Sequence, residues 1–433
     1  MRPTPLYRAY SAATRLILPV AAQLEQRKVL RAGLGKSRAR EKLGHASKPR
    51  PKGQLLWFHA ASVGESLSIL SLIERVGVAL PNAHFLITSG TPTSAELIAN
   101  RLPPQTQHQF APLDAPAPLD RFLKHWQPDA AVFVESELWP QMLWRSHCAG
   151  VPLALLNARM SEKSVTQWMK RPKTSGMLLS VFKLILTQNA QMARAMVSLG
   201  ADEALVAQGV NLKSLSAPLP QNTALIAQTT DALQGRPVWV ASSTHEGEEQ
   251  TVLAAHEHML KTHPDLCLIL APRHPNRRDA VAKLITDHGW ADLRRSADQM
   301  PQPGAPVYLA DSLGELGSWY AVSDMVFLGG SLLPIGGHNP YEVAQAKAAV
   351  ISGVHVSNFA ETFSGLEAAG GVQLVNDSED IARTLSGWID APGALANVVS
   401  AAQAFCNAQD GALDGVAQKL ISALDLNKGQ SRA

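Results

Sequence analysis

Residues Gln54–Val76 read QLLWFHAASVGESLSILSLIERV and decide the fold of the first half of the chain. Leu55–His59 is a short apolar run with two aromatic residues, which is typical of a buried strand. Ala60–Gly64 is small and turn-like, and apolar residues then recur at helical spacing up to Val76. The order strand, turn, helix predicts an open α/β sheet, in which ligands bind where strands end and such turns begin.

The turn after this strand carries Ser62 and Glu65, and two interpretations of the pair remain open. Their spacing matches a capping box, in which Ser62 caps the helix and Glu65 folds back onto it. A carboxylate in this place can also act as a general base toward a bound hydroxyl group. The window alone favours the cap, and a helix N-terminus stabilises the anionic form of a glutamate, which weakens it as a base.

The composition indicates a folded protein of more than one domain. The 433 residues exceed one ordinary core, and 46% of them are hydrophobic while 17% are charged. The three cysteines lie far apart and match neither a disulfide framework nor a metal motif, which indicates a reducing compartment. The 14 histidines show no paired-ligand pattern, so we expect no metal and no cofactor.

The net charge of +3 is unevenly distributed. Residues 1–52 hold 13 Lys and Arg against two Asp and Glu, a net of +11, whereas the rest of the chain carries −8. This asymmetry predicts an anionic partner for the N-terminal segment. Residues 12–24 form an apolar run, interrupted by Arg15 and Pro19, that is too short to span a bilayer. We interpret it either as a helix lying on anionic lipid or as an ordinary surface helix, and residues 36–52 as a polar linker or loop.

Two long stretches alternate short apolar strands with helical segments. Residues 53–217 and 218–433 both show this alternation, which predicts two domains, each with a parallel sheet covered by helices. The linker between them is expected in residues 211–223, which contain several Ser and Pro residues. Residues 392–426 are rich in Ala and predict a helix that packs back on the first domain.

Polar residues follow several predicted strands of the first domain. Thr88–Thr91, Glu135–Glu137 and Asn157–Arg159 each stand where an apolar run ends. Each cluster by itself is also explained by a helix cap or a loop. Because parallel strands end at the same edge of a sheet, we expect the clusters to line one crevice.

The second domain contains the sequence FLGGSLLPIGGHNPYEVA at Phe327–Ala344. Asn339, Pro340 and Glu342 are placed as N-cap, N1 and N3 of a helix. The glycine pairs allow close approach of the backbone to a ligand, their amides can hold an anion, and Glu342 can accept ribose hydroxyls. The pattern is neither GxGxxG nor a P-loop, which disfavours dehydrogenases and ATPases and leaves nucleotide binding or a plain tight loop.

Three more polar turns follow predicted strands of this domain. Arg273 and His274 come after an apolar strand and suit a phosphate or carboxylate, or alternatively a loop salt bridge. Gly314–Leu316 and Ser242–Glu249 follow two further strands and open helices. Three such turns in one sheet favour a shared ligand.

Taken together, several motifs resemble those of the 3-deoxy-D-manno-octulosonic acid (Kdo) transferases. They are WFHAASVGE, FVESELWP, NARMSEKS, ASSTHEGEE, PRHP, SLGEL and FLGGSLLPIGGHNPYE, in that order between Trp57 and Glu342. The resemblance implies a GT-B fold, with two Rossmann-like domains facing across a cleft and a basic N-terminal membrane-associating helix. It also implies an inverting, metal-independent transfer of Kdo from CMP-Kdo to a lipid A precursor of the lipid IVA type, at the cytoplasmic face of the inner membrane, without nucleic acid.

The resemblance also assigns roles to residues. Glu65 of the SVGE turn matches the family's general base. The positions that match the family's CMP-binding residues are Arg273, His274, Gly314, Glu315, Leu316, Asn339, Pro340, Tyr341 and Glu342. The chain departs from the family pattern at residues 208–213, where a compact GNLK is usual, and at Tyr341, where Leu is common. The number of Kdo units transferred stays open.

Two rival functions remain open from the sequence. A nucleotide-sugar 2-epimerase also uses two Rossmann-like domains, but it acts on a soluble UDP-sugar and needs no basic head. A non-catalytic membrane-docking or nucleotide-sensing protein is the other, although the intact Glu65 and Arg273 speak against it.

Overall fold

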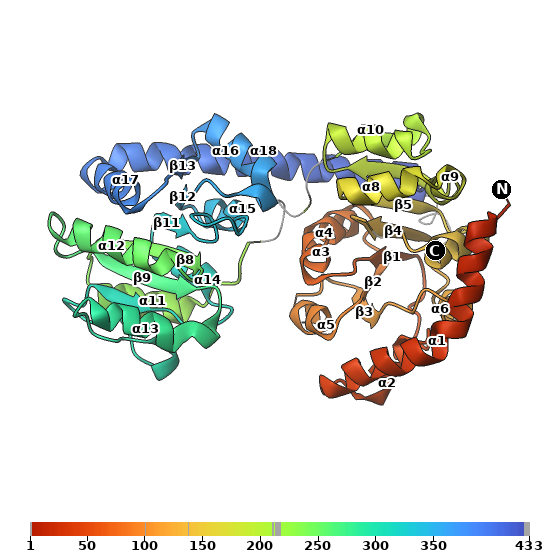
Figure 1. The fold of residues 1–433 in the computed structure, drawn as a ribbon, viewed down its shortest axis with the longest axis horizontal. Coiled ribbons are helices and arrows are strands. Elements are labelled where there is room, and N and C mark those ends of the chain that lie inside the picture. The colour runs from red at the N-terminus through yellow and green to blue at the C-terminus, as the bar shows by residue number, and fades with distance from the viewer. Residues whose placement is uncertain (1, 100, 137, 210–211, 213–217, 428–433) are drawn as a thin grey trace. The chain divides into compact units, whose positions relative to one another are not determined.

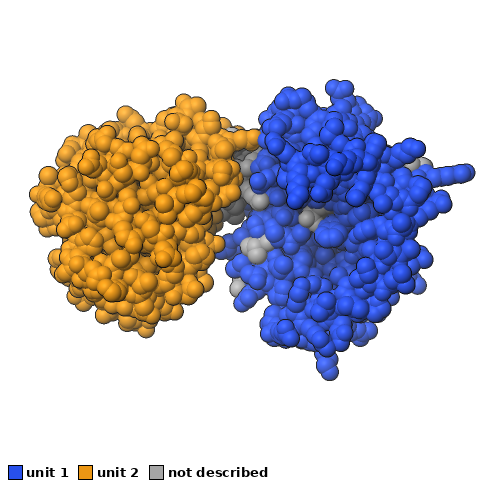
Figure 2. Space-filling model, viewed as in Figure 1, with its two compact units in different colours: residues 1–217, 410–433 blue, residues 218–409 orange. Residues whose placement is uncertain are grey.

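The computed structural model describes residues 2–99, 101–136, 138–209, 212 and 218–427. The chain forms two compact units, residues 1–217 with 410–433 and residues 218–409, which Figure 2 distinguishes by colour. Each unit is a parallel sheet with helices on both faces (Figure 1). The linker predicted at residues 211–223 includes positions 211 and 213–217, which lie outside the described residues.

The sheet of the first unit has seven strands in the order β3-β2-β1-β4-β5-β6-β7 in the described part of the chain. Side chains of β1 alternate between the two faces: Leu56 and Phe58 pack into one core, and Leu55 and Trp57 into the other. The strands are β1 (Leu55–His59), β2 (His84–Ser89), β3 (Thr106–Phe110), β4 (Ala130–Val134), β5 (Leu153–Ala158), β6 (Phe182–Thr187) and β7 (Val206–Gln208).

Helices cover both faces of this sheet. One core contains side chains of α4 and of the end of α18, and the opposite core contains side chains of α6, α7 and α9. The helices of this unit after the N-terminal segment are α3 (Val63–Ser68), α4 (Leu70–Ala79), α5 (Pro92–Ala99), α6 (Pro116–Trp126), α7 (Pro140–Cys148), α8 (Glu162–Met169), α9 (Pro172–Leu179), α10 (Ala190–Ser198) and the 3₁₀ turn η1 (Glu203–Leu205).

The basic N-terminal segment forms two helices, α1 (Pro5–Arg31) and α2 (Gly35–Glu41). The prediction of a polar linker at residues 36–52 is therefore wrong at its start. Glu41 is fully buried, and its carboxylate accepts a hydrogen bond of 2.8 Å from the backbone N–H of Phe110 in β3. This buried contact makes α2 part of the first unit, since a buried carboxylate needs donors from the core. In the described ranges, no helix combines the length and the apolar content needed to cross a membrane.

The sheet of the second unit has six strands in the order β10-β9-β8-β11-β12-β13 within the described residues. They are β8 (Val238–Thr244), β9 (Cys267–Pro272), β10 (Val307–Leu309), β11 (Met325–Leu328), β12 (Ala349–Ser352) and β13 (Val372–Leu374). The helices are α11 (Thr223–Leu233), α12 (Glu248–Leu260), α13 (Arg278–Asp287), α14 (Leu316–Tyr320), α15 (Pro340–Gln345), α16 (Ala360–Ala369), α17 (Ser378–Asp390), α18 (Pro392–Ala423) and the 3₁₀ turns η3 (Pro275–Arg277), η4 (Arg295–Ala297) and η5 (Ser357–Phe359).

The long helix α18 contributes to both units. Ala402 and Cys406 pack in a core of the second unit, whereas Leu413, Leu420 and Ile421 pack in a core of the first unit. One continuous helix thus supplies apolar side chains to two separate cores.

His256 of α12 is a buried histidine in the second unit. Its Nδ1 accepts a hydrogen bond of 3.2 Å from the indole N–H of Trp239, so the proton of the neutral ring lies on Nε2. Nε2 lies 2.8 Å from the carbonyl oxygen of Pro306 and donates to it. Burial lowers the pKa of His256 to about 4. The fold therefore holds this ring neutral over the whole range from pH 7 to pH 5.

We expect acid to destabilise the second unit through His256. Between pH 6.5 and pH 4 the unfolded chain binds a proton that the folded ring does not, so stability falls as the pH falls. The loss attributable to this residue between pH 7 and pH 5 is about 2 kcal/mol. Urea unfolding of the wild type and of His256→Gln at both pH values measures it. A variant that loses as much stability on acidification as the wild type would contradict this assignment.

Candidate active site

Glu65 lies where the strand order of the first sheet reverses, between β1 and β4. It stands in the first turn of α3, directly after β1, and is 9% exposed. Its Oε2 accepts a hydrogen bond of 2.9 Å from the N–H of Ala61, and its Oε1 accepts one of 2.8 Å from the hydroxyl of Ser62. The oxygen of Ser62 in turn lies 3.3 Å from the N–H of Glu65. The capping interpretation is confirmed, and it places the carboxylate at the switch point where ligands of such sheets bind.

A lysine of the basic segment supports this turn. Lys42 is 4% exposed, and its ammonium group donates a hydrogen bond of 2.6 Å to the carbonyl of Gly90, which follows β2. The N–H of Gly90 donates to the carbonyl of Ala61 at 3.1 Å, next to the amide that holds Glu65. Burial lowers the pKa of Lys42 to about 8, although nearby Glu25 opposes the shift. The chain of contacts links α2 to the candidate catalytic carboxylate, a role that the sequence did not indicate.

Two neighbouring strand ends carry backbone conformations that are rare outside glycine. Glu135 after β4 and Asn157 near the end of β5 have φ values of 60° and 54°, and both are buried. The amide nitrogen of Asn157 lies 3.5 Å from a carboxylate oxygen of Glu135. Such conformations cost about 1–3 kcal/mol each and cluster at functional sites. The structure thus brings together Glu135 and Asn157, which belong to two of the clusters predicted to line one crevice.

Glu248 lies at the switch point of the second sheet, between β8 and β11, where its carboxylate is bound by backbone amides of the protein itself. Its carboxylate is fully buried and accepts hydrogen bonds from four backbone N–H groups. The donors are His245 at 2.9 Å, Gly330 at 2.7 Å, Ser331 at 2.8 Å and Leu332 at 2.9 Å. The prediction that the first glycine pair offers its amides to an external anion is therefore wrong for Gly330, because Glu248 occupies that nest.

Four basic or imidazole side chains gather beside this turn. His245 stacks on His338 with ring centroids 5.3 Å apart, and their Nε2 atoms are 3.0 Å apart. His274 meets His245 edge-on at 5.4 Å. Burial, and then the neighbouring His245, Arg273 and His274, lower the pKa of His338 to about 4. His245 and His338 join the predicted Arg273 and His274, and imidazole N–H donors beside a guanidinium suit an anionic ligand. Within the described residues, no group of three or more His, Cys, Asp or Glu side chains is arranged to hold a metal ion.

The other predicted donor-site residues follow β10 and β11, whose ends share an edge of the sheet with those of β8 and β9. Glu315 is held by Arg295, whose Nη2 donates at 3.0 Å, and Asn339 caps α15 by accepting from the N–H of Tyr341 at 3.2 Å. Tyr341 is 2% exposed and stacks on Phe405 at 5.6 Å, so its side chain belongs to the core.

The remaining predicted positions differ in their surroundings. Gly314 has a φ of +82° and open space around it, whereas Leu316 is half-buried against a core and Pro340 is buried. Glu342 lies near enough to Tyr320 to raise the pKa of that phenol further, although burial is the larger cause. The geometry leaves the roles of Glu65 and of the nine donor positions as predictions.

The comparisons with known proteins decide the family. Residues 37–215 match the family model described as 3-deoxy-D-manno-octulosonic-acid transferase (kdotransferase). The chain is 35% identical over 381 residues to a probable mitochondrial 3-deoxy-D-manno-octulosonic acid transferase of Arabidopsis thaliana, covering 86% of this chain and 85% of that one. It is 35% identical over 342 residues to a 3-deoxy-D-manno-octulosonic acid transferase of Haemophilus influenzae, covering 78% and 79%. The chain belongs to the Kdo transferase family.

A solved structure shows the same fold. The UDP-GlcNAc 2-epimerase from Neisseria meningitidis, bound to UDP-GlcNAc, superposes with a TM-score of 0.55 at 12% identity, covering 85% of this chain and 100% of that one. At 12% identity this likeness shows the fold alone. The predicted fold class of two parallel α/β domains is thus confirmed, and the sequence relationship assigns the chain to the Kdo transferase family rather than to the epimerases.

We expect Glu248→Gln to destabilise the second unit of this Kdo transferase family member. Each carboxylate oxygen accepts from two backbone amides, and the NH₂ group of Gln would leave two buried N–H donors without an acceptor. The expected loss is about 2–4 kcal/mol in the free energy of unfolding, with weaker CMP binding as the 329–337 loop shifts. Urea unfolding and calorimetric CMP titration measure both. The matched control is Glu246→Gln, an exposed neighbour, and equal stability of the two variants would refute the role of Glu248.

Proposed function

We propose that this chain transfers Kdo from CMP-Kdo to a lipid A precursor of the lipid IVA type, with inversion at the anomeric carbon. Membership of the Kdo transferase family supports the reaction and the CMP-Kdo donor. The observation that supports the assignment of roles is the position of Glu65 at the switch point of the first sheet. The second unit carries a cluster of basic and imidazole side chains around Arg273, which suits the anionic donor.

The second unit supplies the donor site in this proposal. Arg273 and His274 are exposed at the end of β9 and face no carboxylate within an ion-pair distance in the described residues. Such groups stabilise the phosphate of CMP-Kdo and the negative charge that grows on CMP as it leaves. Glu342 is suited to accept the ribose hydroxyls.

The first unit supplies the base. A glucosamine hydroxyl of the acceptor attacks the anomeric carbon of Kdo from the side opposite CMP. The new carbon–oxygen bond forms as the bond to the CMP phosphate breaks, CMP keeps the electron pair, and the hydroxyl proton passes to the carboxylate of Glu65. General base assistance of this kind is worth about 10²–10⁴-fold in rate.

The helix α1 is the proposed membrane contact, at the cytoplasmic face of the inner membrane. Leu16 is 82% exposed, Ile17 59%, Val20 61% and Leu24 54%. Their spacing places them along one stripe of the helix. Together with the net charge of +11 in residues 1–52, this stripe suits a helix that lies on anionic lipid.

Glu65→Gln separates the capping role from the catalytic role. Glutamine also serves at this position of a capping box, so we expect a free energy of unfolding within about 0.5 kcal/mol of the wild type. CMP affinity is expected to be unchanged, while Kdo transfer falls about 10²–10⁴-fold. Incubation with CMP-Kdo and lipid IVA, read by mass spectrometry, measures transfer and counts the Kdo units.

The matched control is Glu74→Gln, an exposed glutamate on α4. Near-normal transfer by Glu65→Gln would show that Glu65 caps the helix and does not act as the general base. If the wild type and the control also transfer no Kdo, the chain is a non-catalytic docking or sensing protein and the proposal fails.

Substitution of the exposed stripe tests the membrane contact. Leu16→Gln with Val20→Gln removes two exposed apolar side chains without touching Tyr7, Ala22 or Val29, which are buried in α1. We expect vesicle binding to fall about tenfold or more while CMP affinity stays unchanged. Flotation with anionic vesicles measures the first and calorimetry the second. Val78→Gln on α4, at a site 83% exposed, is the control, and equal flotation of both variants would rule α1 out as the contact.

A further inference from the structure

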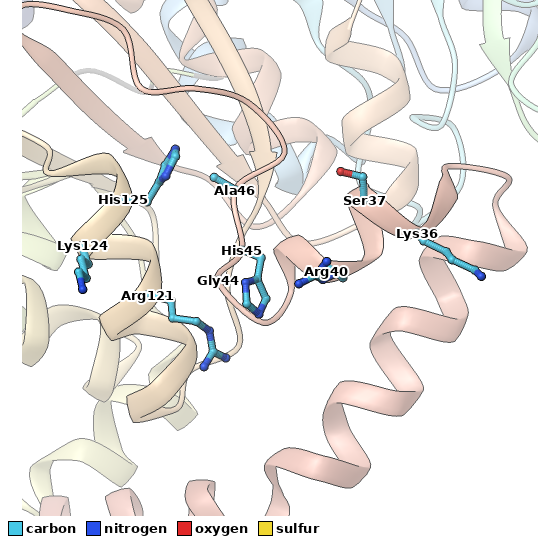
Figure 3. Close-up of a pocket in the computed structure, with 9 residues that line it drawn as sticks. All are labelled: Lys36, Ser37, Arg40, Gly44, His45, Ala46, Arg121, Lys124 and His125. Atoms are coloured by element: carbon cyan, nitrogen blue, oxygen red, sulfur yellow. The ribbon is translucent and has the colours of Figure 1, made fainter.

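The first unit contains a cationic cavity to which the proposed transfer mechanism gives no role. A cavity of about 680 Å³ lies between α2, the loop that follows it, and α6 (Figure 3). Its lining includes four Lys or Arg side chains and two histidines, and no carboxylate among the described residues. The lining residues with polar side chains are Lys36, Ser37, Arg40, His45, Arg121, Lys124 and His125.

One end of this cavity lies away from the switch point of the sheet. The helix α6 begins after β3 and ends before β4, so Lys124 and His125 in its last turn lie toward the amino ends of the strands. Glu65 follows the carboxyl end of β1, at the opposite edge. The end of the cavity formed by Lys124 and His125 is therefore turned away from the candidate catalytic edge.

The walls of the cavity are held in place by contacts between the loop and α6. Arg121 donates through Nε to the carbonyl of Leu43 at 2.8 Å, and the ring of His125 lies 3.0 Å from the carbonyl of Lys48. A Cβ at Gly44 would lie 1.9 Å from the carbonyl oxygen of Pro118, so only glycine fits there. The site is preformed, which reduces the entropy that a ligand must lose on binding.

The cations of the cavity are not neutralised by the protein. Within the described residues, no ion pair involves Lys36, Arg40, Arg121 or Lys124. Two carboxylates of the same helices pair with other residues: Glu41 of α2 forms an ion pair with Arg38, and Asp120 of α6 forms one with Arg145. The C-termini of α6 and α2 account for Lys124 and Arg40, which lie in the last turns of these helices, but not for Arg121 or Lys36.

His45 reports the positive field of the cavity. Figure 3 shows its ring between Arg40 and Arg121. Burial, and then those two guanidinium groups, lower the pKa of His45. An anion bound between the two arginines would offset their positive charge and raise the pKa of His45.

We propose that this cavity is a binding site for a phosphate group. Converging Arg and Lys side chains with a serine hydroxyl suit phosphate oxygens, and the volume admits a phosphorylated headgroup or a small phosphorylated metabolite. The phosphate belongs either to an anionic phospholipid or to a soluble phosphorylated molecule, and both present the same chemistry to the site.

The test uses the full chain and the double variant Lys36→Gln with Arg40→Gln. Both side chains are exposed, and neither belongs to the proposed transfer machinery. Titration with inorganic phosphate, followed through the NMR signal of His45, is expected to raise the pKa of His45 in the wild type. The variant is expected to bind phosphate about 30-fold more weakly. The matched control is Lys183→Gln with Arg194→Gln, an exposed pair of the same charge in the same unit.

A second arm identifies the source of the phosphate. If phosphatidylglycerol vesicles displace inorganic phosphate from the wild type and also bind the variant more weakly than the control, the site takes a lipid headgroup. If vesicle binding is equal but phosphate binding is lost, the site takes a soluble ligand. The proposal is overturned if phosphate leaves His45 unchanged, or if the variant and the control bind phosphate equally. Kdo transfer to a detergent-dispersed acceptor is expected to be unchanged in the variant, so failure here is distinguishable from failure of the proposed function.

Discussion

In a parallel sheet every strand ends at the same edge, and the candidate sites of both units depend on this constraint. In the first unit it brings Glu65, Glu135 and Asn157 from three different strands to one edge. In the second unit it brings the turns after β8, β9, β10 and β11 together, with Arg273 among them. A short turn after each strand then needs only one or two functional side chains, because its neighbours supply the rest.

Buried carboxylates hold these turns in place. Glu41, Glu248 and Glu249 are each fully buried, a state that is costly unless donors surround the charge. Each one is satisfied by a segment distant in the sequence: Glu41 by the N–H of Phe110, Glu248 by the loop after β11, and Glu249 by Arg277 at 2.6 Å. The cost of burial is thus offset by contacts that also fix the position of the loops. Glu248 and Glu249 of the motif ASSTHEGEE are in this sense part of the scaffold of the donor edge.

The basic N-terminal segment has more than one physical role. Its exposed face carries apolar side chains and cations suited to an anionic surface. Its inner face is built into the first unit through Lys42, which is hydrogen-bonded to Gly90 beside the turn of Glu65. Its end shares with α6 a cavity whose cations have no carboxylate partner among the described residues. One segment therefore joins the surface of the unit to its candidate catalytic edge.

Local patterns in the sequence determined much of this protein. They placed the strand Leu55–His59 at its observed limits and identified the Ser62–Glu65 cap, because burial and capping depend on neighbouring residues. The motifs also identified the family. Only the tertiary structure decided that Glu248 occupies the amides of Gly330–Leu332, that His245 stacks on His338 and that Lys42 reaches Gly90. These contacts join residues from 48 to 93 positions apart, and no local periodicity records which distant donor a buried charge will find. The three-residue strand β7 was not predicted for a related reason: it is too short for a pattern and is a strand only because it pairs with β6.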